Sequence, residues 1–152
     1  MSDYRIEKIR RHLVVVLTDG SRIAGEVFLR PVSRFRSSPE EPLELLNDTE
    51  EPFFALHSGD RTLIVAKCNV ARVELPVPDE DDSNLAAIGV PVEVALTNGG
   101  TCTGSIFLET RADRPRLMDF LNAYSLRFLP VIDARQMVLV NKDTIAHVRE
   151  VA

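Results

Sequence analysis

The side chains best suited to bind a metal ion are few and widely separated in this chain. The sequence has three histidines, His12, His57 and His147, and two cysteines, Cys68 and Cys102. A mononuclear site needs three or four ligands that converge on the ion, and these five residues show no ligand spacing. The sequence therefore predicts no metal and no cofactor, and the two cysteines favour reduced thiols in a cytoplasmic protein.

Residues that could catalyse a reaction lie in turns or in acidic runs. Four hydroxyls lie around predicted turns, where hydroxyls serve local hydrogen bonds: Thr18, Ser21, Thr97 and Thr101. No nucleophile stands beside an obvious base in the sequence, and no glycine-rich loop precedes a helix. The crowded carboxylates at 40–51 and 79–82 favour a solvated acidic face over an acid–base pair. We therefore expect no catalytic residues and no enzyme activity.

The strongest candidates for a binding site are two groups of three arginines. They are Arg30, Arg34 and Arg36 in the first half of the chain, and Arg111, Arg114 and Arg116 in the second. Arginine suits bidentate contact with phosphate or carboxylate. Two readings stay open: these residues bind an anion or a partner, or they pair with neighbouring acids such as Glu40, Glu41 and Asp119.

The net charge of −5 is unevenly distributed along the chain. Residues 1–36 carry +4, residues 37–91 carry −9, and residues 92–152 carry 0. An acidic chain repels polyanions at long range, which disfavours nucleic acid as a partner without excluding a local basic patch. The apolar runs are too short to span a membrane, and the N-terminus lacks the apolar core of a signal peptide.

An internal duplication dominates the sequence. Residues 17–29 match residues 96–108 at an offset of 79, with 6 identities in 13 positions. The match resumes at an offset of 75, where Asn47 meets Asn122, Phe53 meets Phe128 and Lys67 meets Lys142. Self-similarity at a fixed offset indicates repeated structural units. We expect residues 1–75 and 92–152 to form the units, with an acidic, proline-containing linker at 76–91.

Each unit has the same predicted plan, which is two strands, a helical turn and three more strands. Asp-Gly and Asn-Gly turns between alternating apolar runs indicate hairpins. The expected strands are 13–17, 23–29, 52–57, 62–67 and 70–75, then 92–96, 102–108, 127–132, 136–141 and 145–151. Proline followed by helix-compatible residues and an asparagine cap predicts helical turns at 42–47 and 115–122. Residues 1–12 could be helix or strand.

Two side-chain expectations follow from the repeated pattern. Gly25 and Gly104 fall inside the second strand of each unit, where glycine usually marks a bulge, a bend or a close backbone approach. The repeat-matched phenylalanines are expected in the core, namely Phe28 with Phe107 and Phe53 with Phe128.

Five short, bent strands in about 60 residues suggest an all-β fold of two tandem SH3-like barrels. The units also resemble Sm-like domains, through the first hairpin at 92–108 and the ending Val-Leu-Val-Asn-Lys-Asp-Thr-Ile-Ala-His-Val at 138–148. The resemblance implies oligomers formed by pairing of edge strands. The RNA-binding signature of that family does not carry over. Sm-like proteins bind RNA through an Asp-x-x-x-Asn signature after the second strand and an Arg-Gly pair in the last hairpin. In this chain no Asn follows Leu108 at the matching spacing, and Asn141-Lys142 stands in place of Arg-Gly.

The sequence supports three functional hypotheses. The first is a non-catalytic interaction or scaffold protein that forms homo-oligomers, with a protein partner still to be identified. The second is an RNA-binding protein that uses the arginine-bearing segments. The third is an enzyme with a pocket that the sequence does not display.

Overall fold

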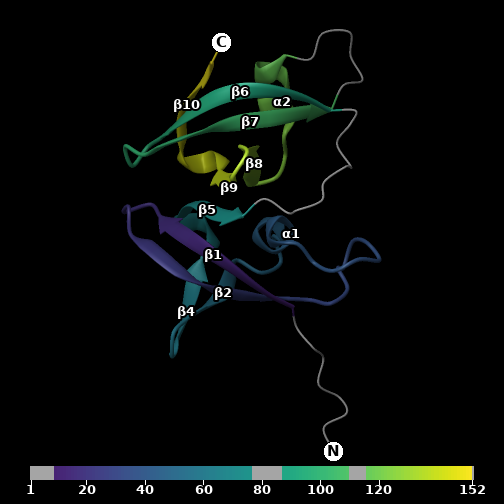
Figure 1. Ribbon diagram of the computed structural model, residues 1–152, viewed down its shortest axis with the longest axis vertical. Coiled ribbons are helices and arrows are strands. Elements are labelled where there is room, and N and C mark those ends of the chain that lie inside the picture. The colour runs from purple at the N-terminus through teal and green to yellow at the C-terminus, as the bar shows by residue number, and fades with distance from the viewer. Residues whose placement is uncertain (1–8, 77–86, 110–115, 152) are drawn as a thin grey trace, which may run out of the picture.

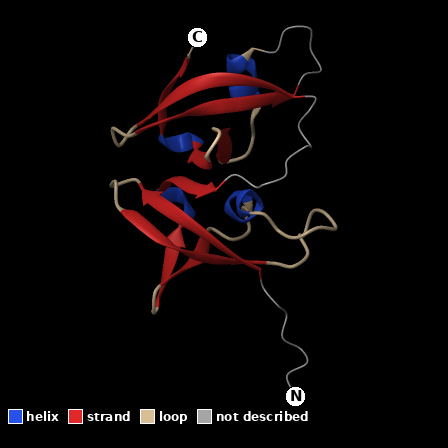
Figure 2. Cartoon of the chain, in the orientation of Figure 1, coloured by secondary structure: helices blue, strands red, loops and turns tan. Residues whose placement is uncertain are grey.

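The computed structural model describes residues 9–76, 87–109 and 116–151, and these residues form an all-β fold with short helices. Figures 1 and 2 show the elements in space. The first unit contains β1 (Ile9–Leu17), β2 (Arg22–Leu29), α1 (Pro42–Asn47), β3 (Phe53–Ser58), β4 (Arg61–Ala66), η1 (Lys67–Asn69) and β5 (Val70–Pro76). The second contains β6 (Ala87–Leu96), β7 (Thr101–Glu109), α2 (Leu117–Ala123), β8 (Phe128–Ile132), β9 (Gln136–Asn141), η3 (Lys142–Thr144) and β10 (Ile145–Glu150).

The strands form one open sheet of ten strands, in the order β10-β6-β7-β8-β9-β5-β1-β2-β3-β4. Every paired neighbour is antiparallel. The two units meet where β5 of the first pairs with β9 of the second. In Figure 1 the first unit occupies the lower part of the molecule and the second unit the upper part, with β5 and β9 between them. The sheet therefore continues from one unit into the other.

The strand register repeats at the offsets found in the sequence. Leu13 pairs with Gly25 in the first unit, and Val92 pairs with Gly104 in the second. The β3–β4 and β8–β9 hairpins correspond residue by residue, and β1–β5 and β6–β10 carry the same irregularity. A one-residue slip would turn each apolar face outward. The duplicated apolar alternation is consistent with the two units having the same register.

Glycine is needed at four repeat-matched positions for two different reasons. Gly20 and Gly99 adopt φ of 90° and 88° in the first hairpin of each unit, a conformation that other residues rarely adopt. A Cβ on Gly25 would lie 2.8 Å from the carbonyl oxygen of His57. A Cβ on Gly104 would lie 2.9 Å from Cγ1 of Val131. These two glycines therefore allow the second strand to approach the third.

The apolar core has two clusters, and each includes residues from the other unit. Phe128 and Leu139 of the second unit are fully buried in the cluster built mainly by the first unit. Ala71 of the first unit is fully buried in the cluster of the second. Side chains therefore cross the junction in both directions, and burial across it stabilises both units.

Several details differ from the sequence-based expectation. Residues 1–12 could be helix or strand from the sequence. Residues 9–12 are strand, as part of β1, and residues 1–8 lie outside the described residues. β5 includes Pro76 and β6 begins at Ala87, so both strands extend into the expected linker. Asp48, rather than Asn47, is the C-cap of α1. The short 3₁₀ helices η1 and η3 were not predicted from the sequence.

The core prediction for the phenylalanines is wrong at three positions. Phe107 is 37% exposed and Phe53 is 54% exposed, while Phe28 is half-buried and Phe128 is fully buried. Phe28 and Phe107 face the space between helix and strands, where each lines a pocket. Phe53 lies on β3, beside the last strand of the open sheet.

Candidate functional site

The three arginines of the first unit are engaged with carboxylates. Arg30 lies 3.4 Å from Glu40 and 3.0 Å from Glu51. Arg34 lies 2.9 Å from Glu50, 3.1 Å from Asp48 and 3.2 Å from Glu51. Because Asp48 and Glu51 follow α1, their pairs with Arg34 and Arg30 fasten the segment before α1 to the segment after it, and the carboxylate of Asp48 is almost fully buried.

Arg36 makes a corresponding contact with the start of α1. Its guanidinium lies 2.5 Å from Glu44, and it also donates to the carbonyl of Pro39. Burial raises the pKa of Glu44, but hydrogen bonds from Arg36, Ser33 and the Glu41 backbone, together with the charge of Arg36, leave the pKa below its usual value. The first arginine group thus serves as a set of internal ion pairs.

The second arginine group is only partly described. Arg116 is the exposed N-cap residue of α2, whereas Arg111 and Arg114 lie outside the described residues. The described parts of the chain do not bring Arg116 together with Arg30, Arg34 or Arg36 in any hydrogen bond or ion pair.

The most specific polar contact between the units is made by Asn47. Its side-chain nitrogen donates to the carbonyl of Phe128 at 3.2 Å, and its side-chain oxygen accepts from the backbone N–H of Phe128 at 2.7 Å. One amide thus satisfies both backbone groups of the first residue of β8. We call this contact the asparagine clamp. The Tyr124 hydroxyl reinforces the clamp by donating to the same carbonyl at 2.6 Å.

Backbone pairing extends the junction beside the clamp. Val73 pairs with Leu139, Glu74 with Val138 and Leu75 with Met137. The buried Asn141 donates from its side-chain nitrogen to the carbonyl of Val70 at 2.9 Å. The junction therefore combines a strand ladder, a helix-to-strand clamp and a buried amide, and each recognises backbone rather than side chains.

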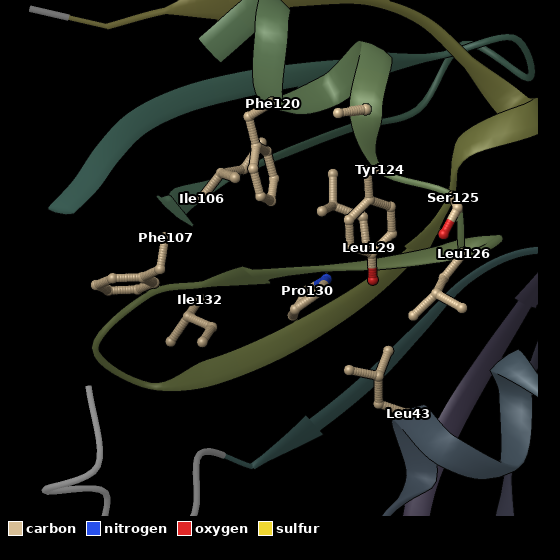
Figure 3. Close-up of a pocket in the computed structure, with 11 residues that line it drawn as sticks. Leu43, Ile106, Phe107, Phe120, Tyr124, Ser125, Leu126, Leu129, Pro130 and Ile132 are labelled. Atoms are coloured by element: carbon tan, nitrogen blue, oxygen red, sulfur yellow. The ribbon is translucent and has the colours of Figure 1, made fainter. Parts of the chain in front are cut away.

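A pocket of about 500 Å³ lies where α1 meets the second unit. Figure 3 shows Leu43 pointing from α1 towards side chains of the second unit, among them Tyr124, Leu126 and Pro130. Its lining is mainly apolar, with contributions from β7, α2 and β8. The pocket volume falls in the range of ligand sites, and its lining includes the polar residues Tyr124 and Ser125. Leu43 occupies one side of the pocket.

The first unit has a smaller pocket of about 320 Å³ at the equivalent place. Six lining positions correspond between the pockets: Phe28 with Phe107, Leu45 with Phe120, Glu51 with Leu126, Phe54 with Leu129, Ala55 with Pro130 and His57 with Ile132. Arg30, Glu40 and Glu51 add charge to the first pocket. The described residues that line this pocket all belong to the first unit.

The two outermost strands of the sheet, β4 and β10, form the candidate site. Within the described residues, each of them pairs on one side only. Figure 1 shows β4 low and β10 high on the long axis of the molecule. Ile64 on β4 is 71% exposed, and Ala146 and His147 on β10 are exposed. An unpaired apolar edge is a template for strand addition unless something covers it.

Other kinds of site are not visible in the described ranges. Residues 9–76, 87–109 and 116–151 hold no group of three or more His, Cys, Asp or Glu that could bind a metal ion. None of their helices combines the length and apolar character needed to cross a membrane. Cys68 is exposed and Cys102 half-buried, and both are free thiols.

Comparison of the chain with protein-family models, curated proteins and solved structures gives no match. Sequence reasoning missed the clamp, because it assigned Asn47 to a helix cap. A signal was present, since Asn47 and Asn122 are identical at equivalent positions of the duplication.

Proposed function

We propose that the protein is a non-catalytic interaction or scaffold module of two tandem small barrels, similar to Sm-like domains. It binds other chains by adding strands at β4 and β10. The observation that carries this proposal is the junction of β5 with β9. In the duplication, β5 is the equivalent of β10 and β9 is the equivalent of β4, so strands equivalent to the two free edges already pair within the chain. The strand edges supply main-chain hydrogen bonds, and the neighbouring exposed apolar side chains supply burial.

The arrangement of polar groups favours this function over the alternatives. The described arginines of the first unit are paired with acids rather than gathered on an open basic face. An RNA-binding protein would gain affinity from free phosphate contacts, and its binding would weaken steeply with salt. We expect no submicromolar binding of uridine-rich or adenine-rich strands at physiological salt. Such binding, abolished by Arg111→Ala together with Arg114→Ala, would favour the RNA-binding alternative.

The test of the proposed function is capture of partners by proteins with one edge blocked. Ile64→Lys places a charge on the β4 edge and Ala146→Lys places one on the β10 edge. Thr103→Lys is the control, because Thr103 is exposed on β7, which is paired on both sides. The wild-type chain and the control should retain the same partners from host lysate. Each edge variant should lose those that use its edge. Partners retained equally by all four proteins would contradict binding through strand edges.

A further inference from the structure

We propose that the partner at these edges is a second copy of the chain, joined by an interface that repeats the junction of β5 with β9. In this interface, β10 and α2 of one copy bind β4 and β3 of the next. The inference rests on the proposed function and adds the identity of the partner, the strand register and the residues that fix it.

The duplication supplies both surfaces of this interface. The junction within the chain uses β5 and α1 from the first unit and β9 and β8 from the second. Their equivalents at the offset of 75 are β10 and α2 on one side and β4 and β3 on the other. The molecule therefore carries a second set of both halves of its own junction. These halves lie at opposite ends of the sheet, on its two outermost strands.

Burial at equivalent positions supports this assignment. Leu139 and Phe128 are fully buried at the junction, while their equivalents Ile64 and Phe53 are 71% and 54% exposed. On the other half, Leu43 is half-buried, whereas its equivalent Met118 is 66% exposed. Apolar side chains at all three outer positions match the junction, and water exposure there is unfavourable.

Ala71 and Ala146 extend the comparison to the fifth strand of each unit. Ala71 is fully buried in the core cluster of the second unit, and Ala146 is exposed. Both alanines lie at the same irregularity in strand pairing, where the register skips one residue. A small side chain at this position lets the neighbouring unit approach closely.

The asparagine clamp supplies the specific polar contact. Asn122 is the equivalent of Asn47 and is exposed on α2. Phe53 is the equivalent of Phe128 and begins β3, as Phe128 begins β8. In the proposed interface, the Asn122 amide of one copy donates to the Phe53 carbonyl of the next copy and accepts from its backbone N–H. Met118 then faces the smaller pocket, in the place that Leu43 takes at the larger one.

The register follows from the junction. Val73 pairs with Leu139 within the chain, so Val148 pairs with Ile64 between copies. By the same step, Arg149 lies opposite Leu63 and Glu150 opposite Thr62. One contact is lost, because Ala66 stands where the buried Asn141 donates to the neighbouring strand. The interface between copies is therefore weaker than the junction, and its occupancy depends on protein concentration.

The two edges cannot pair within one molecule. They are the first and last strands of a ten-stranded sheet, and Figure 1 shows them towards opposite ends of the long axis of the molecule. The contact uses two different surfaces, so it is heterologous and closes into a ring or extends into a filament. Each added copy covers one free edge of the assembly and presents one fresh edge of the same kind.

Light scattering on the purified chain tests this assembly. We expect masses at higher multiples of 17.0 kDa as concentration rises. Ile64→Lys and Ala146→Lys should each remain monomeric alone, because each chain has lost one of the two surfaces. Mixed in equal amounts, they retain one complete interface and should form a dimer of twice the monomer mass. Thr103→Lys should assemble like the wild type.

The asparagine clamp has its own measurement. Asn122→Ala should weaken association by roughly tenfold or more, because two hydrogen bonds to backbone are lost, and its melting temperature should match that of the wild type at monomeric concentration.

The assembly proposal is overturned if the wild-type chain stays at 17.0 kDa up to millimolar concentration. It is also overturned if Ile64→Lys or Ala146→Lys alone still dimerises, which would indicate a symmetric contact. A monomeric chain that still captures other proteins through its edges would overturn only the identity of the partner, whereas edge-independent capture would overturn the proposed function.

Discussion

In the first unit, the space between the helix and strands β2 and β3 is lined partly by charged side chains, whereas the equivalent space of the second unit is lined mainly by apolar ones. Arg30, Glu40 and Glu51 line the first space. Leu126 replaces Glu51 in the second, and Leu43 reaches in from the other unit. The backbone register around the two spaces is nevertheless the same. Strand pairing is therefore fixed by turns, glycines and apolar alternation, while side chains at the pockets are free to diverge.

The backbone register that the two units share should depend most strongly on the two strand glycines. Gly25→Val and Gly104→Val should each destabilise the fold by about 1–3 kcal/mol, because a side chain there meets the neighbouring strand. At both positions the added Cβ meets a backbone carbonyl that cannot rotate away, since it would lie 2.8 Å from the oxygen of His57 at Gly25 and 3.0 Å from the oxygen of Ile132 at Gly104. Thermal melts beside Thr103→Val, which changes an exposed strand position, provide the comparison. Unchanged melting of both glycine variants would show that the close approach is not needed.

The two equivalent asparagines should separate stability from assembly. Asn47→Ala leaves the N–H and carbonyl of Phe128 without that partner at a fully buried residue, so it should cost about 1–3 kcal/mol of unfolding free energy. Asn122→Ala changes an exposed residue and should stay within about 0.5 kcal/mol of the wild type. Denaturant titration at low protein concentration measures both. Equal losses would mean that Asn122 also has a structural partner within its own chain.

Much of this fold follows from local sequence signals. Asp19-Gly20 and Asn98-Gly99 predict the first hairpins because positive φ at Gly20 and Gly99 needs glycine. The duplication predicts that both units share one plan, and their registers agree. Strands β1 and β6 begin earlier than the apolar runs at 13–17 and 92–96 predict, because Ile9 and Ile88 lie outside those runs.

The contacts that define the candidate site were harder to predict. Asn47 looks like a helix cap in isolation, and only the three-dimensional placement of β8 against α1 shows that its amide binds Phe128. The arginines near residue 30 looked equally suited to anions or to acids. Their pairing depends on how the segment at 30–41 folds back on the segment at 48–51, which no local pattern specifies. Long-range placement is therefore the information that the local patterns lacked.

The two repeat-matched lysines should show a smaller difference between the units. Lys67 is buried, and its ammonium donates to the carbonyls of Leu45 and Asp48 at 2.5 and 3.0 Å, at the end of α1. Lys142 is half-buried and donates to the carbonyl of Tyr124. Lys67→Met should cost about 1–2 kcal/mol, because the carbonyls lose their donor, and Lys142→Met should cost less. Urea midpoints of the two variants check the order, and the reverse order would contradict the role given to burial.

The smallest expected effect concerns acid and the charged segment of the first unit. Burial raises the pKa of Glu44, but hydrogen bonds from Arg36, Ser33 and the Glu41 backbone, with the charge of Arg36, lower it overall. A carboxyl whose pKa is lowered on folding stabilises the protein above its unfolded-state pKa, and that stabilisation is lost as pH falls through the folded-state value. Glu44→Gln should therefore lose less than about 1 kcal/mol at pH 7, because Arg36 is 39% exposed and the pair is screened.

The same variant should respond less to acid than the wild type. Urea midpoints measured from pH 7 down to pH 3 should converge as Glu44 of the wild type becomes protonated, since both proteins then lack the charged pair. Asp60→Asn is the control, because Asp60 is exposed in the turn between β3 and β4 and should leave the pH profile unchanged. A constant gap between Glu44→Gln and the wild type at every pH would mean that the carboxylate charge does not stabilise this segment, and that shape alone distinguishes it from its counterpart in the second unit.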